Sequence, residues 1–367
     1  MRKLVAVDLP CGDAFVSAVK LIWDSGDAVL PLDQRLPDAT KKDIVLRLGA
    51  HQVVHSGGKS SIGGFNVEPD DALVIHTSGT SGLPKGVVLT HEALMASSIM
   101  TSEALSVEQK LDVWLCCLPV SHIGGFSVVS RALHTGTQLL LHESFEARRC
   151  EAASRKDGAS LVSLVPTALR RIDASLFKKI LVGGSSIPDS LPENVVATYG
   201  MTETGSGVVY DGLPLTGVEI EIRNEEIFVK SPSLFRAYRD DSPALEKGWF
   251  ATGDAGHIDA NGKLLVSGRL EEVIVTGGEK VWPQVVERHI NSLRLFREVA
   301  VVGRPDDEWG QVVTAVVLTD EASEVPDLAM LREQLASLLP RYALPKAIEV
   351  VDSFPRNRSG KLLRKSI

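Results

Sequence analysis

The segment Thr77 to Gly86 concentrates groups that bind phosphate. It reads Thr-Ser-Gly-Thr-Ser-Gly-Leu-Pro-Lys-Gly and follows an apolar run at Leu73 to Ile75. Glycines let the backbone turn tightly and present N–H groups to an anion, the hydroxyls add donors, and Lys85 adds a positive charge. The Walker A pattern fails, because Pro84 stands at its second glycine and Gly86 at its Ser/Thr position. The segment therefore predicts a polyphosphate loop of another kind.

Further motifs follow this loop in a fixed order. They are Leu118 to Gly125, Gly183 to Pro188, Tyr199 to Glu203, Gly248 to Asp254, Gly268 to Glu272, Gly277 to Glu279 and Pro355 to Lys361. Together with the phosphate loop they resemble the signatures of the acyl-adenylate-forming superfamily, which includes acyl-CoA ligases, firefly luciferase and the adenylation domains of peptide synthetases. The resemblance covers nearly the whole chain. It implies that a carboxylic acid is activated with ATP and Mg²⁺ and is then transferred to the co-substrate CoA.

The resemblance implies a role for each matching residue. The implied ATP- or AMP-binding residues are Thr77, Ser78, Gly79, Thr80, Ser81, Gly82, Lys85, Gly183, Gly184, Ser185, Tyr199, Gly200, Asp254 and Arg269. Thr202 would contact the α-phosphate, and Glu203 would ligate Mg²⁺, a hard cation that prefers oxygen ligands. Asp254 would accept hydrogen bonds from the ribose hydroxyls, with Arg269 nearby.

Lys361 is the implied catalytic lysine, acting with Thr202 and Glu203. The segment from Arg341 to Ile367 contains seven basic and two acidic residues, although the whole chain has a net charge of −8. In the superfamily the lysine at this position bridges the carboxylate and the α-phosphate during adenylation. A flexible point charge placed on developing negative charge stabilises a transition state.

The resemblance also implies an acyl pocket, a CoA tunnel and a hinge. The expected acyl-substrate residues are His122, Gly125, Arg131, Ser163 and Ser206. Gly277 and Gly278 would border the pantetheine tunnel, where glycine permits close approach of the backbone, and Lys280 would meet CoA phosphates. Glu271 is the hinge candidate, because a hinge needs only to absorb a backbone rotation.

Within the superfamily the chain most resembles the o-succinylbenzoate-CoA ligases of menaquinone biosynthesis. Arg131 lies in an otherwise apolar stretch, and a buried guanidinium there needs a counter-ion that either a second substrate carboxylate or an acid of the protein could supply. The run Ser163 to Thr167 is typical of these ligases, and Val209 to Leu215 is similar to a run in short actinobacterial forms. Two alternatives stay open: a ligase for benzoate, coumarate or a fatty acid, and a nucleotide-binding relative without catalysis.

Strand-length apolar runs alternate with amphipathic stretches up to about residue 270, which predicts an α/β domain with largely parallel strands. The pattern after Leu270 predicts a smaller α+β domain, with a helix over Pro283 to Ser292. We therefore expect a domain of residues 1–269 that binds AMP and the acyl group, shortened at its amino-terminal part, and a mobile domain of residues 270–367 that carries Lys361. The pair Asn261-Gly262 favours a type I′ hairpin turn.

Composition and the absence of certain motifs argue against several other classes of protein. An acidic chain is not a general nucleic-acid binder, and no apolar run approaches the ~20 residues that span a bilayer. The four cysteines include no CxxC pair, so we expect a reducing, cytoplasmic setting without disulfides. The pair His51 and His55 lacks the glutamate of a zinc protease, and no GxSxG elbow is present. The expected partners are small molecules, namely an aromatic dicarboxylic acid, ATP and CoA, with a homodimer possible and no stable membrane insertion.

Overall fold

The fold is taken from a computed structural model, which describes residues 2–78, 84–184, 190–240, 242, 245–319, 327–356 and 362–367. These residues group into two compact units. The first comprises Met1–Glu221, Phe228–Ala251 and Ala260–Leu264, and the second comprises Ile222–Ile227, Thr252–Asp259 and Leu265–Ile367. The boundary between Arg269 and Leu270 stays a prediction.

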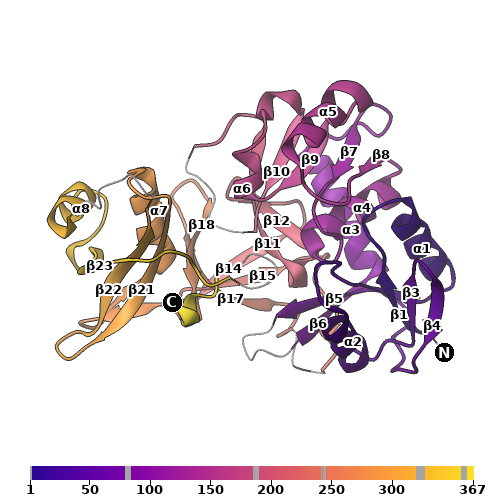
Figure 1. The fold of residues 1–367 in the computed structure, drawn as a ribbon, viewed down its shortest axis with the longest axis horizontal. Helices are drawn as coiled ribbons and strands as arrows, with labels where there is room; N and C mark the ends of the chain where they lie inside the picture. Colours follow the sequence, from indigo (N-terminus) through magenta and orange to yellow (C-terminus); the bar gives the residue numbers. More distant parts are fainter. Residues whose placement is uncertain are drawn as a thin grey trace. The chain divides into compact units, whose positions relative to one another are not determined.

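Two sheets form the frame of the first unit (Figure 1). As described, the first sheet has seven strands in the order β16-β6-β5-β2-β1-β3-β4, and the second has seven in the order β13-β12-β11-β10-β9-β7-β8. The first contains β1 (Leu4–Asp8), β2 (Ala28–Pro31), β3 (Gln52–His55), β4 (Gly58–Ser61), β5 (Asp71–Ser78), β6 (Pro84–Thr90) and β16 (Ala237–Tyr238). The second contains β7 (Val113–Cys116), β8 (Gln138–Leu141), β9 (Leu161–Leu164), β10 (Lys179–Val182), β11 (Val195–Met201), β12 (Ser206–Tyr210) and β13 (Leu213–Pro214).

The inner strands of both sheets are parallel. In the first sheet β1 pairs in parallel with β2 and β3, and in the second β7, β9, β10 and β11 form a parallel series. Parallel neighbours need crossover connections, and helices supply many of them. The helices of this unit are α1 (Asp13–Asp24), α2 (Asp38–Arg47), α3 (His91–Ala104), α4 (Ile123–Thr135), α5 (Ala147–Asp157) and α6 (Pro166–Leu169). The predicted α/β class with largely parallel strands is confirmed.

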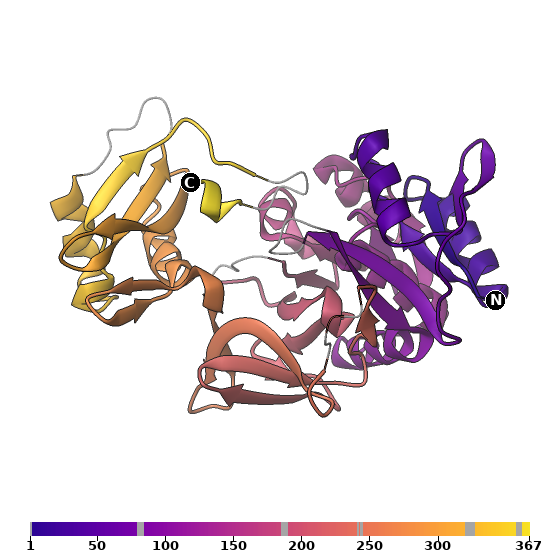
Figure 2. The ribbon, with the colours of Figure 1, turned by 90° about the horizontal axis from the view of Figure 1, so that it is seen from below.

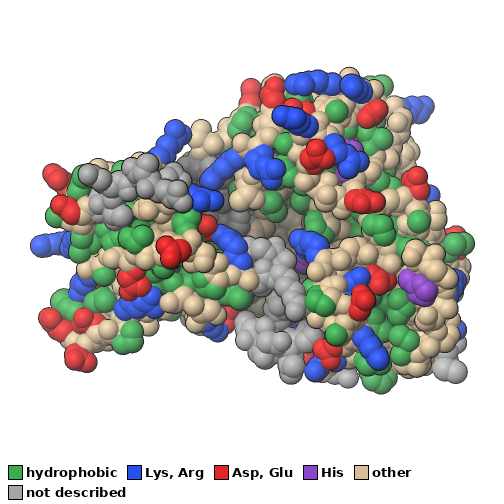
Figure 3. Space-filling view, in the orientation of Figure 1, with side chains coloured by type: hydrophobic (Ala, Val, Ile, Leu, Met, Phe, Trp, Pro, Cys, Tyr) green, Lys and Arg blue, Asp and Glu red, His purple; other side chains and the backbone are tan. Residues whose placement is uncertain are grey.

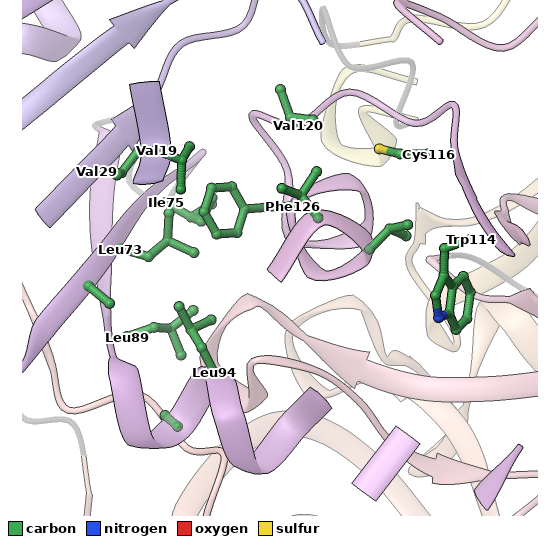
Figure 4. Packing of buried hydrophobic residues seen from close by; sticks show 14 of the residues in the cluster. Val19, Val29, Leu73, Ile75, Leu89, Leu94, Trp114, Cys116, Val120 and Phe126 are labelled. Carbon is green, nitrogen blue, oxygen red and sulfur yellow. The ribbon is translucent and has the colours of Figure 1, made fainter. Parts of the chain in front are cut away.

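Helices α1, α3 and α4 contribute to the largest hydrophobic core, which both sheets share. Phe126 of α4 packs with Leu73 and Ile75 of β5, and Cys116 of β7 belongs to the same cluster (Figure 4). Local signals fix the ends of these helices. Thr90 caps α3, because its side chain accepts a hydrogen bond from the backbone N–H of Ala93. Gly136 follows α4 with φ of 68°, the left-handed conformation in which many helices end.

A separate four-stranded sheet has the order β14-β15-β17-β18 (Figure 2). Its strands are β14 (Glu219–Arg223), β15 (Glu226–Lys230), β17 (Phe250–Ile258) and β18 (Leu264–Arg269). The type I′ prediction at Asn261-Gly262 is wrong, because only Gly262 of that pair has positive φ. Within this sheet, the turn between β14 and β15 has positive φ at both central residues, 49° at Asn224 and 71° at Glu225.

The second unit contains a five-stranded sheet and two α-helices, as described. Its elements are β19 (Ile274–Thr276), β20 (Glu279–Val281), α7 (Pro283–Ser292), β21 (Glu298–Asp306), β22 (Gly310–Leu318), α8 (Leu328–Leu335) and β23 (Ala347–Val350). Helix α7 has the bounds predicted from the sequence. The second unit also contains the short 3₁₀ turns Leu270–Glu272, Arg341–Ala343 and Arg364–Ser366. Two further 3₁₀ turns, Ala174–Leu176 and Thr202–Thr204, belong to the first unit. The smaller α+β domain is confirmed.

Two expectations about the chain as a whole can be compared with the structure. Among the described residues, no helix is both long and apolar enough to cross a bilayer. All four cysteines are free and buried. Lys and Arg side chains lie among acidic ones over the first unit (Figure 3).

Candidate functional site

A β-hairpin carries the ends of the predicted phosphate loop. Strands β5 and β6 are antiparallel, with Thr77 opposite Lys85. The Thr77 hydroxyl donates a hydrogen bond to the carbonyl of Lys85 over 3.5 Å. Ser78 is placed by its backbone alone, while the predicted loop residues Gly79, Thr80, Ser81 and Gly82 lie outside the described residues. The hairpin therefore fixes where the loop leaves and rejoins the sheet.

The two predicted charges of this region meet through a tyrosine that the sequence did not single out. Lys85 Nζ lies 4.9 Å from the centre of the Tyr238 ring, and the Tyr238 hydroxyl donates a hydrogen bond to Glu203 Oε1 over 3.1 Å. Strand β16 brings Tyr238 there, because it pairs with Val87 of β6. No local pattern announces this contact, since it depends on a strand more than a hundred residues downstream. The cation of Lys85 and the carboxylate of Glu203 therefore both contact Tyr238, which lies between them.

Thr202 and Glu203 lie on a tight turn that follows β11. The turn Thr202–Thr204 is held by Thr204, which is buried and whose hydroxyl accepts a hydrogen bond from the Met201 N–H. The Phe235 N–H donates to the carbonyl of Glu203 over 2.8 Å. The Glu203 carboxylate has an oxygen besides Oε1 for a cation, and a carboxylate is the donor that Mg²⁺ prefers. The predicted metal ligand therefore fits its role chemically.

The glycines predicted around adenine are required by close packing. A Cβ at Gly183 would lie 2.4 Å from Thr198 Oγ1, and one at Gly200 would lie 2.1 Å from the carbonyl oxygen of Ser206. Gly184 has φ of 88°, which also favours glycine. Tyr199 is half-buried on β11 opposite Val209. Ser185 lies outside the described residues.

Helix α4 carries the most unusual charge of the molecule. Arg131 is 1% exposed, and its guanidinium carbon lies 4.5 Å from the centre of the Trp114 ring. Within the described part of the chain, Nε and Nη1 meet no hydrogen-bond acceptor and no carboxylate forms an ion pair with Arg131. Burial lowers the pKa of Arg131. Among the described residues, therefore, no acid serves as the counter-ion of Arg131.

The other predicted acyl residues lie on or near the same elements. Ser206 begins β12 with φ of 143°, and its hydroxyl donates to Ser127 Oγ over 3.4 Å, one helical turn before Arg131 on α4. Ser163 is half-buried on β9. Gly125 is required by packing, because a Cβ there would lie 2.3 Å from the carbonyl oxygen of Pro119.

His122 stands immediately before α4 and has two charged neighbours. Its Nε2 lies 3.1 Å from Arg35 Nη2 and 3.4 Å from Asp33 Oδ2. Both neighbours belong to the segment after β2, Asp33-Gln34-Arg35, which the sequence did not assign a role. A second imidazole, His76 of β5, is close enough to be influenced electrostatically, and burial followed by the charge of His122 lowers its pKa.

The remaining predicted residues belong to the second unit. Arg269 Nε lies 3.0 Å from Asp254 Oδ1, and Arg269 Nη1 donates to the carbonyl of Thr252 over 3.0 Å. Asp254 is 7% exposed, so this ion pair holds a nearly buried carboxylate in one orientation. Arg269 was expected to lie near Asp254, and the contact of either residue with ribose stays a prediction.

The predicted CoA and hinge residues lie in the second unit, in a 3₁₀ turn, in strand β20 and in the turn before this strand. A Cβ at Gly277 would lie 2.6 Å from the Trp309 ring, and Gly278 has φ of 86°. Lys280 forms an ion pair with Glu225, so its charge is already partly compensated. Glu271 lies in the 3₁₀ turn Leu270–Glu272 with Lys365 Nζ 3.4 Å from its Oε2.

The segment that bears Lys361 lies outside the described residues, but both of its flanks are fixed. Arg356 pairs with Leu362 in an isolated antiparallel bridge, and the Leu363 N–H donates to the carbonyl of Pro355 over 2.9 Å. Arg364 forms a further anchor, because its guanidinium bonds Glu287 and Glu272 as well as the carbonyl of Val301. The two ends of the segment therefore meet at one place.

Comparisons with known proteins agree with this geometry. The family model described as AMP-binding enzyme matches residues 12–239, and the model described as AMP-binding enzyme C-terminal domain matches residues 285–361. The chain is 33% identical over 334 residues to a 2-succinylbenzoate--CoA ligase of Enterococcus faecalis, with 80% of this chain and 68% of that protein covered.

Solved structures give the same result for the fold. The o-succinylbenzoate CoA synthetase of Bacillus subtilis, in complex with the acyl-adenylate intermediate OSB-AMP, superposes with a TM-score of 0.87 at 26% identity, covering 100% of this chain and 88% of that one. The same synthetase in complex with ATP and magnesium ion gives a TM-score of 0.86 at 26% identity, covering 100% and 89%. The acyl-adenylate-forming fold is thus confirmed.

Proposed function

Because this chain belongs to the family of AMP-binding enzymes, we propose that it is an ATP-dependent ligase that joins 2-succinylbenzoate to CoA. In the first half-reaction a carboxylate oxygen of the acid attacks the α-phosphorus of ATP and pyrophosphate leaves. In the second the CoA thiol attacks the acyl carbon and AMP leaves. The products are 2-succinylbenzoyl-CoA, AMP and pyrophosphate. This reaction is a step of menaquinone biosynthesis.

The choice of acid rests on the buried guanidinium of Arg131, whose Nε and Nη1 meet no hydrogen-bond acceptor among the described residues. A monocarboxylic acid has its one carboxylate consumed by the reaction, so it leaves no anion for a second cation. A dicarboxylic acid brings a spare carboxylate, which can accept charge-assisted hydrogen bonds from Nε and Nη1. Such a ligand supplies the hydrogen-bond acceptor for Arg131 that the described part of the protein lacks. Ser206, which bonds Ser127 on the same helix, is the proposed neutral donor beside it.

In adenylation the protein must hold the triphosphate and neutralise charge at the α-phosphorus. Lys85 and the Thr77 hydroxyl, at the base of the phosphate loop, are the proposed contacts of the outer phosphates, and Thr202 is the proposed contact of the α-phosphate. Glu203 would hold Mg²⁺, which when bound neutralises phosphate charge, and Tyr238 orients that carboxylate by donating to Oε1. Lys361 is proposed to bridge the attacking carboxylate and the α-phosphate, where a point charge has its largest effect.

Thioester formation is assigned to a second pose of the smaller domain. Glu271 is the proposed pivot, and Gly277 and Gly278 the proposed border of the CoA tunnel. Lys280 is a weaker candidate for CoA phosphates, since Glu225 already pairs with it. A homodimer and a cytoplasmic location stay predictions, which sedimentation and cell fractionation would test.

The proposal is tested by a CoA- and ATP-dependent assay over a panel of acids that includes 2-succinylbenzoate, benzoate, coumarate and a fatty acid. We expect turnover with 2-succinylbenzoate and its loss in Lys361→Ala. Arg131→Ala should lose far more activity on 2-succinylbenzoate than it alters ATP binding. Equal activity of this variant and the parent would contradict the role of Arg131, and preferred turnover of a monocarboxylic acid would contradict the substrate.

A further inference from the structure

The segment after β2 forms a compact ion pair that touches His122. Asp33 is 8% exposed and accepts two hydrogen bonds from the Arg35 guanidinium, from Nε to Oδ1 over 2.9 Å and from Nη2 to Oδ2 over 2.6 Å. The backbone N–H of Arg35 donates to the same Oδ1 over 3.0 Å. Arg35 is therefore held in one orientation by a carboxylate only two residues away.

The second hydrogen of Arg35 Nη2 is what reaches His122. Nη2 carries two N–H groups, of which one points to Asp33 Oδ2, and His122 Nε2 lies 3.1 Å from the same nitrogen. A guanidinium can only donate hydrogen bonds, so His122 Nε2 must be the acceptor in this contact. The proton of the imidazole is then on Nδ1, because the bond that one ring nitrogen makes fixes the state of the other.

Asp33 could have bound His122 instead, and the geometry shows why it does not. Its Oδ2 lies 3.4 Å from His122 Nε2, whereas its two oxygens lie 2.9 Å and 2.6 Å from nitrogens of Arg35. Burial opposes the ionisation of Asp33, and the hydrogen bonds from Arg35 are the main contribution that holds the pKa of Asp33 well below its usual range. Arg35 thus binds both oxygens of Asp33, the carboxylate to which a protonated His122 Nε2 would otherwise donate.

We propose that Arg35, held by Asp33, is a positioning residue that fixes His122 as the Nδ1–H tautomer, so that Nδ1–H is the donor offered to an anionic oxygen of the acid substrate. The choice of ligand rests on the proposed function, whereas the tautomer rests on geometry alone. In the part of the chain that is described, no residue bonds to Nδ1, and the His122 side chain is 40% exposed. The histidine also stands at the N-terminus of α4, the helix that carries Arg131.

The first test reads the tautomer directly. In protein labelled with ¹⁵N at histidine, the ring nitrogen that bears a proton and the one that does not have well separated chemical shifts, and His122→Gln identifies the signals of His122. We expect the parent to show a protonated Nδ1 and a bare Nε2. In Arg35→Gln, Nε2 should gain the proton and face Asp33. A protonated Nε2 in the parent, or an unchanged pattern in Arg35→Gln, would overturn the proposal.

Two further variants separate this effect from a general structural one. Asp33→Asn removes the carboxylate but leaves Arg35 to donate, so Nε2 should stay without a proton. Arg47→Gln breaks a similar arginine–aspartate pair, with Asp43, that has no histidine beside it. It should leave the His122 signals unchanged. Arg35→Lys serves if Arg35→Gln fails to fold, because a single ammonium cannot hold Asp33 bidentately and also reach His122.

Kinetics supply the second readout. With 2-succinylbenzoate, Arg35→Gln should raise the KM for the acid about tenfold, since one oriented hydrogen bond to a charged group is lost, while the KM for ATP changes little. An unchanged KM for the acid together with a changed tautomer would overturn the assignment of Nδ1–H to the acid. If no acid is turned over by the parent, the proposed function fails, but the spectrum still decides whether Arg35 fixes His122.

Discussion

The central carbon of the Arg131 guanidinium lies over the Trp114 ring, 4.5 Å from the ring centre. Such a contact contributes about 2 kcal/mol when it is desolvated. Removing a guanidinium from water costs several kcal/mol, which is more than the stacking returns. The described part of the protein therefore compensates this charge only partly. This imbalance is what we expect of a group whose carboxylate partner arrives with the substrate.

The same imbalance predicts that removing Arg131 stabilises the protein. Arg131→Met replaces a buried charge by an apolar chain of similar length, so the free energy of unfolding should rise by about 1 to 4 kcal/mol. Urea unfolding followed by circular dichroism would measure it. Lower stability of Arg131→Met than of the parent would show that the guanidinium has a partner in the folded protein.

Arg236 provides the matched control for this experiment. It is paired with Asp71 through Nε at 2.7 Å and Nη2 at 2.9 Å, and Asp71 is 1% exposed. Arg236→Met leaves a buried carboxylate without its guanidinium, so we expect a loss of about 3 to 5 kcal/mol. The two substitutions are chemically identical, and their effects on stability should have opposite signs.

Tyr238→Phe tests the link between the phosphate hairpin and the predicted magnesium ligand. The change removes the hydrogen bond to Glu203 Oε1 but keeps the ring beneath Lys85. The Mg²⁺ concentration for half-maximal pyrophosphate exchange should rise about tenfold, because a hydrogen bond to a charged group contributes about 1.5 to 3 kcal/mol. Tyr342→Phe, at an exposed tyrosine of the second unit, should leave it unchanged. A Mg²⁺ requirement that is identical in Tyr238→Phe and the parent would separate Tyr238 from the metal site.

The sequence predicted those parts of the fold that local patterns determine. The apolar run Leu161–Leu164, for example, became the parallel strand β9, because inner parallel strands are largely buried and read as continuous apolar segments. Helix α7 was recovered with both ends, since Pro283 opens it. The type I′ turn was misplaced, because the loop between β17 and β18 is longer than two residues while the one at Asn224-Glu225 is not.

The same distinction between local patterns and long-range contacts applies to the residues of the site. Residues inside contiguous motifs, such as Thr202 with Glu203, could be predicted because chain neighbours stay together in the fold. Tyr238 and the pair of Asp33 and Arg35 could not, since their contacts with Glu203 and His122 join segments far apart in sequence. The burial of Arg131 was foreseen from its apolar neighbours, but the absence of a protein acid beside it among the described residues needed the structure.

Two half-buried histidines predict how stability depends on pH. His91 and His134 lie against Trp23, with ring centres 5.3 Å and 5.7 Å from it, and burial is the main cause that lowers the pKa of each. The unfolded chain then binds protons more readily as the pH falls through about 6.5, so stability should decrease from pH 7.5 to pH 5.5. His134→Gln should reduce this slope, and His257→Gln, at an exposed position, should not. A slope that His134→Gln leaves intact would assign the acid sensitivity to other groups.

Gly200→Ala tests whether close packing of β11 against β12 positions the turn that carries Thr202 and Glu203. A Cβ at Gly200 would lie 2.1 Å from the Ser206 carbonyl oxygen and 2.7 Å from Gly207 Cα, so the backbone must move. A displacement of about 1 Å at a catalytic group lowers the rate about a hundredfold. We expect a loss of that size in pyrophosphate exchange, with the protein still folded by circular dichroism. Gly12→Ala is the control, because its Cβ would meet no heavy atom within 4 Å, and full activity of Gly200→Ala would show that the turn tolerates the displacement.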